Sequence, residues 1–534
     1  MSRLFILFLF ICFTVIAKDP YPKNENIDVK QYRFQLELND STDVIAGEAT
    51  VSILFKKSLA SFDLDLFGVS GSGKGMKTKS ITSNGKAVSF THQNNKINLK
   101  LSPAPIAGEQ ISFIISYSGI PEDGLIIGKN KFNERGFFGD NWPDRGHHWL
   151  PSVDHPSDKA PVEFVIIAPE HYQVIATGKL VEESNLTKHR KLTHWKESIE
   201  VAVKVMTIGV ARFSIQLSGE PGGIPVTTWV YPQNREDGFY DFAVAPKVLE
   251  FFQGYVGPFS YEKLAHVQSK TRWGGLENAS NIFYFENSVN GKADHEGLIA
   301  HETAHQWFGN SASENDWHHV WLSEGFATYF TNLYFEYTYG HDRLVTEAKA
   351  QRKQVTEYFK KNPAPIVDTT ITDINKVLST NTYQKAGWVL HMLRHEIGDV
   401  AFHKGIREYY ATYRNSNALT PDFQRIMESN SGKDLDLFFD QWLYKGGNPQ
   451  LSGSWSYDAK TKEVIISLNQ DQKGQIFKTP MEIGWKGGQG EPVVQTVELA
   501  SKNQIFRLSA SAKPTSLTLD PNTWLLFEGE IQAK

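Results

Sequence analysis

The stretch His301-Glu302-Thr303-Ala304-His305, read together with Glu324 after eighteen intervening residues, decides how the chain is organised. On a helix, positions i and i+4 project from the same face, so the two histidines can place two imidazole nitrogens on one metal ion. A catalytic zinc needs three protein ligands and one open position, and a carboxylate can be the third ligand. The sequence therefore predicts a zinc site with His301, His305 and Glu324 as ligands and Glu302 beside them as a proton acceptor.

Each of these residues also has an ordinary structural interpretation. His301 and His305 could be core histidines with satisfied hydrogen bonds, and Glu324 could be a first-turn glutamate that complements a helix dipole. The combination favours the metal site, because Glu302 and a third ligand accompany the two histidines. Apolar residues on both sides of the motif predict that its helix is buried.

Length and composition limit the classes of protein to consider. The chain has 534 residues, which is too long for one hydrophobic core. A hydrophobic share of 40% with 22% charged residues is typical of a globular protein. The formal net charge of -5 gives no support for a nucleic-acid partner, so we expect none.

Residues 1–17 are predicted to be a secretory signal peptide. Arg3 precedes an apolar run from Leu4 to Ile16, and this run is short for a membrane span. An uncleaved N-terminal anchor is the alternative. Cys12 is the only cysteine, so the mature chain would contain no disulfide. We therefore expect a secreted or periplasmic protein without stable membrane association after removal of the signal.

The hydrophobic pattern divides the remaining chain into three regions. From 18 to 215, apolar and polar residues alternate, as around Tyr32 and Phe34, which predicts an antiparallel β domain. From 216 to 449 the pattern becomes mainly helical, which predicts a mostly α domain with a small sheet. From 450 to 534 the strand pattern returns, and the simplest prediction is a β-sandwich.

Two motifs resemble those of one family. The interval between His305 and Glu324, with the sequence Trp321-Leu322-Ser323-Glu324-Gly325, resembles that of the gluzincin aminopeptidases related to aminopeptidase N and leukotriene hydrolase. Gly274-Gly275-Leu276-Glu277-Asn278 is similar to the Gly-x-Met-Glu-Asn exopeptidase motif of this family, with leucine in place of methionine. The resemblance covers the β domain and the catalytic region. It implies a thermolysin-like catalytic domain, one zinc ion, and peptide substrates with a free N-terminus.

The resemblance also implies roles for individual residues. It implies that Gly274, Gly275 and Asn278 belong to an edge strand that pairs with the substrate. Glu277 would bind the free amine, since a carboxylate pairs with an ammonium and the neighbouring glycines let another backbone come close. Tyr383, in Tyr383-Gln384-Lys385-Ala386, is similar to a family tyrosine that donates a hydrogen bond to the oxyanion.

The chain departs from the family pattern in two places. Leu150-Pro151-Ser152-Val153-Asp154 resembles a family segment that is preceded in many members by a glutamine or glutamate, which helps to hold the substrate amine. Counting back from this segment leads to Asn141 or Asp144, which we predict as substitutes for that residue. The second departure is C-terminal, where family members often have a large helical domain and this chain has a short β region.

We therefore expect a zinc aminopeptidase in which water activated by the metal attacks the first peptide bond. Glu302 would act as the general base, Tyr383 would stabilise the oxyanion and Glu277 would hold the amine. A thermolysin-type endopeptidase and a catalytically silent peptide-binding module are the alternatives. The presence of Glu302 with all three ligands argues against the silent module. One branch of the family adds an epoxide hydrolase activity, for which no residue of this chain argues.

Overall fold

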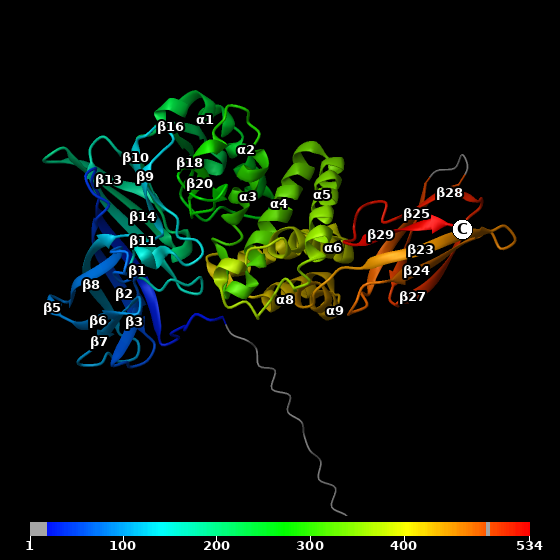
Figure 1. Ribbon diagram of the computed structural model, residues 1–534, viewed down its shortest axis with the longest axis horizontal. Helices are drawn as coiled ribbons and strands as arrows, with labels where there is room; N and C mark the ends of the chain where they lie inside the picture. Colours follow the sequence, from blue (N-terminus) through cyan, green and yellow to red (C-terminus); the bar gives the residue numbers. More distant parts are fainter. Residues whose placement is uncertain (1–18, 488–491) are drawn as a thin grey trace, which may run out of the picture.

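Three regions follow one another along the longest axis of the molecule (Figure 1). The computed structural model describes residues 19–487 and 492–534. Strands of the N-terminal region lie at one end, helices fill the centre, and strands of the C-terminal region lie at the other end. The predicted signal peptide, 1–17, lies outside the described residues.

An eight-stranded sheet is the main layer of the N-terminal region. Its order is β13 (Lys179–Leu186), β14 (Arg190–Ala202), β11 (Lys159–Pro169), β1 (Ile27–Glu37), β2 (Ile45–Phe55), β8 (Gln110–Ile120), β4 (Gly75–Ser83) and β5 (Lys86–Ala87). The predicted alternation is confirmed in β1, where Tyr32 and Phe34 are fully buried. One pair departs from the predicted antiparallel arrangement, because β1 and β11 run parallel. Their connection is long enough to cross over, which a parallel pair requires.

Two smaller sheets complete the N-terminal region. One has the order β12 (Gln173–Ala176), β15 (Ile208–Ala211), β10 (Arg135–Gly139) and β9 (Leu125–Lys129). The other has the order β3 (Ser61–Asp65), β7 (Lys96–Lys100) and β6 (Ser89–Gln93). The chain leaves β10 in a loop that carries Asn141 and Trp142, and this loop reaches the central region.

The central region combines a five-stranded sheet with helices. The sheet has the order β16 (Ser214–Gly219), β17 (Val226–Val230), β18 (Leu264–Ser269), β20 (Asn281–Phe285) and β19 (Gly275–Leu276), so β19 is an edge strand. The helices are α1 (Arg235–Asp241), α2 (Ala245–Tyr255), α3 (Glu296–His305), α4 (Trp321–Tyr339), α5 (His341–Phe359), α6 (Ala386–Ile397), α7 (Asp399–Tyr413), α8 (Thr420–Ser431) and α9 (Asp436–Phe439). Two short strands, β21 (Ala312–Glu314) and β22 (Ser416–Ala418), pair in parallel. Among the described residues, no helix is both long and apolar enough to cross a membrane.

An aromatic core fixes α3 against α4. The ring of Phe308, just after α3, lies 4.8 Å from the ring of Phe326 and 4.6 Å from that of Phe330, both on α4. All three side chains are fully buried. Close-packed aromatic rings resist sliding because any shift opens a void. The two helices that carry the predicted metal ligands are therefore held in one relative position.

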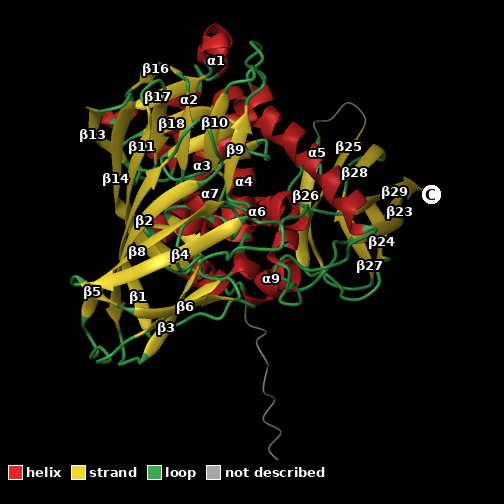
Figure 2. Ribbon diagram, turned by 60° about the vertical axis from the view of Figure 1, so that its left-hand side comes forward, coloured by secondary structure: helices red, strands yellow, loops and turns green. Residues whose placement is uncertain are grey.

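The C-terminal region consists of two small sheets (Figure 2). One has the order β27 (Asn503–Ser509), β24 (Glu463–Gln470), β23 (Gln450–Asp458) and β29 (Glu528–Ala533). The other has the order β26 (Val493–Leu499), β25 (Thr479–Gly487) and β28 (Pro514–Leu519). The region is joined to the helices by an ion pair of 2.5 Å between Arg352 and Asp520 and by contact between the rings of Trp442 and Phe477, 4.7 Å apart.

Candidate active site

The structure brings His301, His305 and Glu324 together. The Nε2 atoms of the two histidines are 3.2 Å apart. Oε2 of Glu324 lies 3.5 Å from Nε2 of His301 and 3.2 Å from Nε2 of His305. The two histidines come from α3 and the glutamate from the first turn of α4. These three atoms therefore form a nearly equilateral triangle. We call the three residues His301, His305 and Glu324 the ligand triad.

The dimensions of the ligand triad fit a zinc ion. Bonds of about 2.0–2.1 Å at tetrahedral angles place neighbouring ligand atoms about 3.3 Å apart. The three distances in the triad, 3.2, 3.2 and 3.5 Å, agree with this spacing. Two nitrogens and one carboxylate oxygen are also a common donor set for catalytic zinc. The triad is thus suited to hold zinc with one coordination position left for water or substrate.

A second layer of contacts orients His305. Its Nδ1–H donates to the carbonyl of Phe308 at 3.1 Å, and the hydroxyl of Ser323 lies 3.0 Å from the same nitrogen. A hydrogen on Nδ1 leaves the lone pair of Nε2 free for a metal. Gly309 allows this close arrangement, because a β-carbon there would be 2.1 Å from Oγ of Ser323 and its φ is +114°.

The edge strand β19 lies directly against Glu302. A β-carbon built on Gly275 would be 2.3 Å from Oε1 of Glu302, whereas one on Gly274 would meet no atom within 4 Å. Glu302 is 5% exposed. The predicted general base and the predicted substrate strand are therefore in contact.

The predicted amine-binding residue, Glu277, follows this strand and is held by the segment that comes directly after α3. Its backbone carbonyl accepts hydrogen bonds from Nε2 of Gln306 at 3.0 Å and from Nδ2 of Asn310 at 2.5 Å. Its carboxylate lines the same cavity as the ligand triad, and Oε1 has no hydrogen-bond partner among the described residues. The edge of β19 opposite β20 pairs with no other described strand, which leaves backbone groups for a substrate.

Tyr383 also lines the cavity that contains Glu277 and the ligand triad. It lies in a π-helical turn, Asn381–Lys385, that leads directly into α6. Its ring stacks on the imidazole of His301 with 5.9 Å between centroids and 13° between planes. Burial raises the pKa of its phenol well above the ordinary value, so the hydroxyl keeps its proton and remains a donor.

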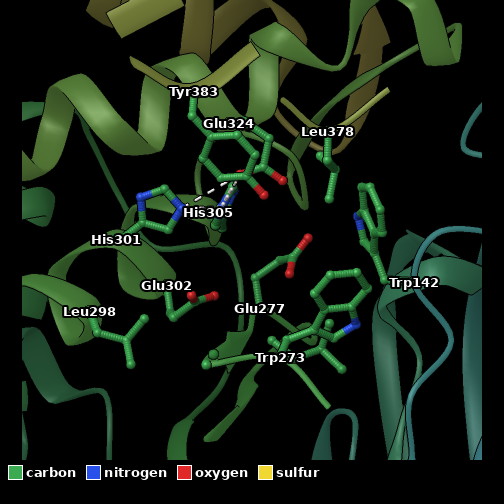
Figure 3. Close-up of a pocket in the computed structure, with 13 residues that line it drawn as sticks. Trp142, Trp273, Glu277, Leu298, His301, Glu302, His305, Glu324, Leu378 and Tyr383 are labelled. Atoms are coloured by element: carbon green, nitrogen blue, oxygen red, sulfur yellow. Dashed lines mark hydrogen bonds and ion pairs between the residues drawn. The ribbon is translucent and has the colours of Figure 1, made fainter. Parts of the chain in front are cut away.

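The cavity around the ligand triad has a volume of about 230 Å³. Figure 3 shows Glu277 between the triad and two tryptophans, Trp142 and Trp273, with Leu298 on the opposite side. Sequence reasoning missed both tryptophans. Trp273 directly precedes the Gly-Gly-Leu-Glu-Asn motif, and this position is the one signal that could have identified it.

Three buried carboxylates give the cavity a preference for positive charge. Burial raises the pKa of Glu302 well above its ordinary value, and it also raises the pKa of Glu277. Burial lowers the pKa of His305, but the carboxylates around it raise that pKa overall to about 10. Burial raises the pKa of Glu324, but the two histidines bring it below its ordinary value. The position between the imidazoles is therefore one that stabilises a cation.

The structure does not place Asn141 or Asp144 among the residues that line this cavity, so it gives no support to their predicted role as substrate-binding residues. The side-chain amide of Asn141 is fully buried; it donates to the carbonyls of Val203 and Met206 and accepts from Nε1 of Trp149. Asp144 lines a different cavity beside Asp154, and burial raises its pKa to about 6. Trp142 lies between Asn141 and Asp144 in the sequence. It is the residue of this loop that lines the cavity of the ligand triad.

Asn278 also lies outside the set of residues that line the cavity. It is 1% exposed, and no described residue is a hydrogen-bond partner of its side-chain amide. Its backbone carbonyl lies 3.4 Å from Nε2 of Gln306. Of the predicted motif, Gly274, Gly275 and Glu277 reach the cavity and Asn278 does not.

Two family comparisons agree with this geometry. The Peptidase family M1 domain matches residues 240–442, and the Peptidase M1 N-terminal domain matches residues 29–202. Together they cover more than two thirds of the chain. The chain belongs to peptidase family M1. The resemblance inferred from the sequence motifs is thereby confirmed, and membership of M1, a family of zinc metallopeptidases, implies zinc as the metal.

Curated M1 relatives are distant and longer. The probable aminopeptidase 2 of Sulfurisphaera tokodaii is 24% identical over 77% of this M1 chain and 54% of its own length. The glutamyl aminopeptidase of Sus scrofa is 25% identical over 72% of this chain and 42% of its own length. The chain therefore spans about half, or less, of the length of these relatives.

A solved structure shares the fold of this M1 chain. It is a mutant of an M1 zinc metallopeptidase from Deinococcus radiodurans bound to a Tyr-Ser-Ala substrate. The two structures superpose with a TM-score of 0.66 at 20% sequence identity, covering 80% of this chain and 96% of the other. The predicted multidomain architecture, with an N-terminal β domain, a helical catalytic domain and a C-terminal β region, is confirmed at the level of the fold.

Proposed function

We propose that the protein is an aminopeptidase that uses one zinc ion to remove N-terminal residues from peptides. One observation carries this proposal. Glu277, a buried carboxylate with an oxygen that lacks a partner among the described residues, lies in the same cavity as the ligand triad and Glu302. A carboxylate in that place binds a free ammonium group, so it fixes the substrate by its first residue.

The charges of the cavity support the same substrate. Glu277, Glu302 and Glu324 place three carboxylates in one buried space. A zinc ion and one ammonium group carry three positive charges, which balance the three carboxylates. Buried charges are stable only when they are paired, so a peptide with a free amine fits the cavity better than one with a blocked amine.

Each residue of the cavity has a separate role in the proposed hydrolysis. Zinc, when bound, acts as a Lewis acid and lowers the pKa of water. Glu302 takes the proton of the attacking water and passes it to the leaving amine, a role that suits a carboxylate whose pKa is raised by burial. The hydroxyl of Tyr383 donates to the oxygen of the scissile carbonyl as negative charge develops there. Gly274 leaves room for the backbone of the substrate, whereas Gly275 leaves room for the carboxylate of Glu302.

An endopeptidase is the second candidate, since the same ligands and general base suffice for it. It would need open space for chain on both sides of the scissile bond. Glu277 and the two tryptophans occupy one side in this structure (Figure 3). A silent peptide-binding module would not need Glu302 in contact with the substrate strand. The geometry therefore favours the aminopeptidase.

An aminoacyl anilide and its N-acetylated counterpart separate these functions. We expect the zinc-loaded protein to hydrolyse the free anilide and to lose at least about 10²-fold in kcat/KM on the acetylated one, because acetylation removes the charge that pairs with Glu277. Comparable hydrolysis of both would indicate an endopeptidase. Binding of peptides without turnover would indicate the silent module. Glu302→Gln should keep the zinc and lose most of the turnover.

The name of the mammalian relatives refers to glutamyl substrates, and we do not extend that preference to this chain. The residues described as lining the cavity include no lysine or arginine that could pair with an acidic side chain.

We also propose that the protein is exported, with residues 1–17 as its signal peptide. We propose no nucleic-acid partner for it. Mass spectrometry of the exported protein should find an N-terminus near Lys18, and a retained 1–17 segment would contradict this.

A further inference from the structure

The inference concerns the side chain of the substrate's first residue, and it rests on the proposed function. The α-carbon of that residue is bonded both to the ammonium nitrogen and to the carbonyl carbon. With the ammonium at Glu277 and the carbonyl at the ligand triad, the side chain must start in the space next to both. In Figure 3 this space is bounded by Trp142, Trp273 and Leu378.

The two tryptophans form a fixed corner. Their rings pack edge to face, with 6.2 Å between centroids and 80° between planes. Trp142 also packs edge to face on Trp317, at 5.5 Å and 79°. Trp142 is 3% exposed, whereas Trp273 is 36% exposed at the mouth of the cavity. The corner is therefore built by the N-terminal region and the catalytic region together.

Trp142 lies in the sequence between Asn141 and Asp144, the two residues predicted to help hold the substrate amine. Its neighbour Asn141 uses its amide to bind the carbonyls of Val203 and Met206, so it points away from the cavity. Three glutamates line the cavity. Glu324 is a predicted zinc ligand and Glu302 is the proposed general base, so Glu277 is the one that remains to bind the ammonium. The surface next to it is aromatic instead of polar.

The arginines near this corner are already paired. The guanidinium of Arg145 lies over the ring of Trp273, 5.8 Å from its centroid, and forms an ion pair with Asp140. Arg272 pairs with Asp123 at 2.5 Å. Neither arginine is among the residues that line the cavity. An acidic side chain in this corner would therefore meet carboxylates and find no lysine or arginine among the described residues that line the cavity.

We propose that Trp142 and Trp273 are specificity-determining residues that select large neutral side chains, aromatic or aliphatic, at the N-terminus of the substrate. Such side chains gain from leaving water and from contact with the indole rings. Small side chains leave the corner unfilled. Acidic side chains lose hydration and are repelled by Glu277 and Glu302.

Anilides of phenylalanine, leucine, alanine and glutamate test the proposal with the zinc-loaded full chain. We expect kcat/KM for phenylalanine and leucine to exceed that for alanine by about tenfold or more, with glutamate lowest. Trp273→Ala should lower the ratio of phenylalanine to alanine at least about fivefold. Since Trp273 is partly exposed, this variant should fold. Trp142→Leu should lower the ratio as well, and Trp142→Phe should keep most of it.

Binding gives a readout that does not depend on turnover. Calorimetric titration of the Glu302→Gln variant with phenylalaninamide and alaninamide should show about a tenfold difference in Kd, and Trp273→Ala should reduce this difference. Tyr337→Ala, an exposed aromatic outside the cavity, is the matched control and should leave both ratios unchanged.

The outcomes separate the two proposals. If no anilide is hydrolysed, the proposed function is wrong. If the alanine anilide is hydrolysed but the ratio of phenylalanine to alanine is near one, only the specificity inference is overturned. A ratio that Trp273→Ala and Trp142→Leu both leave unchanged, or a preference for the glutamate anilide, also overturns it.

Discussion

Gly275 and Glu302 are in such close contact that position 275 has no room for a β-carbon. The distances from that β-carbon would be 2.3 Å to Oε1 and 2.5 Å to Cδ of Glu302. The φ of Gly275 does not lie in the left-handed region, so the restriction is purely steric. The strand proposed to bind the substrate thus also positions the proposed general base.

Gly275→Ala should therefore displace the carboxylate of Glu302. We expect kcat/KM to fall by about 10²-fold, because a shift of about 1 Å in a catalytic group has an effect of this size. Gly254→Ala, on α2 and outside this cavity, is the matched control, since its β-carbon would meet no atom within 4 Å, and it should change kcat/KM by less than about threefold. Zinc content, measured by mass spectrometry, should stay at the wild-type level in both. An equal loss in both variants would contradict the steric explanation.

Gly309→Ala should weaken the binding of zinc. Its β-carbon would be 2.1 Å from Oγ of Ser323 and 3.3 Å from Nδ1 of His305, so it would disturb the contacts that orient this ligand. We expect a loss of about 10- to 100-fold in zinc affinity, measured by competition with a chelator. Adding Ser323→Ala should recover part of the loss, because it removes the atom that clashes. The strain from the positive φ of Gly309 would remain. No recovery in the double variant would show that the clash with Ser323 is unimportant.

Asp144→Asn should change kcat/KM by less than about twofold, because Asp144 lies in a different cavity from the ligand triad. Glu277→Gln provides the contrast. It should lower kcat/KM at least about tenfold, mainly through KM, because an amide pairs less strongly with an ammonium than a carboxylate does. A loss in Asp144→Asn as large as that in Glu277→Gln would restore Asp144 as a substrate-binding residue.

Lys385→Met should stabilise the protein most strongly below pH 7. The ammonium of Lys385 is fully buried without a hydrogen-bond partner among the described residues, and burial lowers its pKa to about 7. Below that pH the folded state buries a charged lysine, and its removal should raise the free energy of unfolding by about 1–3 kcal/mol. Between about pH 7 and the ordinary lysine pKa of about 10.5, the unfolded state binds more protons. The stability of the wild type should therefore rise with pH relative to the variant.

Thermal unfolding of wild type and Lys385→Met at pH 6 and pH 9 measures this difference. The gap in Tm between the two proteins should be larger at pH 6. Lys361→Met, at an exposed lysine, is the control and should show no such dependence. A gap that is equal at both pH values would mean that the charge of Lys385 is compensated in the folded state.

The sequence was most informative where the signal is local. His301 and His305 are four residues apart on one helix, so the period of the helix alone aligns them. Glu324 comes from a second helix, and its assignment depended on the interval after His305 and on the resemblance to a family. The strands around Tyr32 were predictable because their side chains alternate between core and solvent. The parallel pairing of β1 with β11 was not, since it joins segments far apart in the chain.

The sequence by itself pointed to the residues of the ligand triad, to Glu302 as the proposed general base and to the family of the fold, because these depend on residue types at fixed short spacings. Only the tertiary structure decided which residue of the Asn141 loop lines the cavity. Asn141 is turned inward by carbonyls about sixty residues away, and this rotation leaves Trp142 to meet Trp273. Hydrogen bonds and ring contacts between distant segments leave no periodic trace in the sequence. The contact between Gly275 and Glu302 is of the same kind, since it exists only when the edge strand lies against α3.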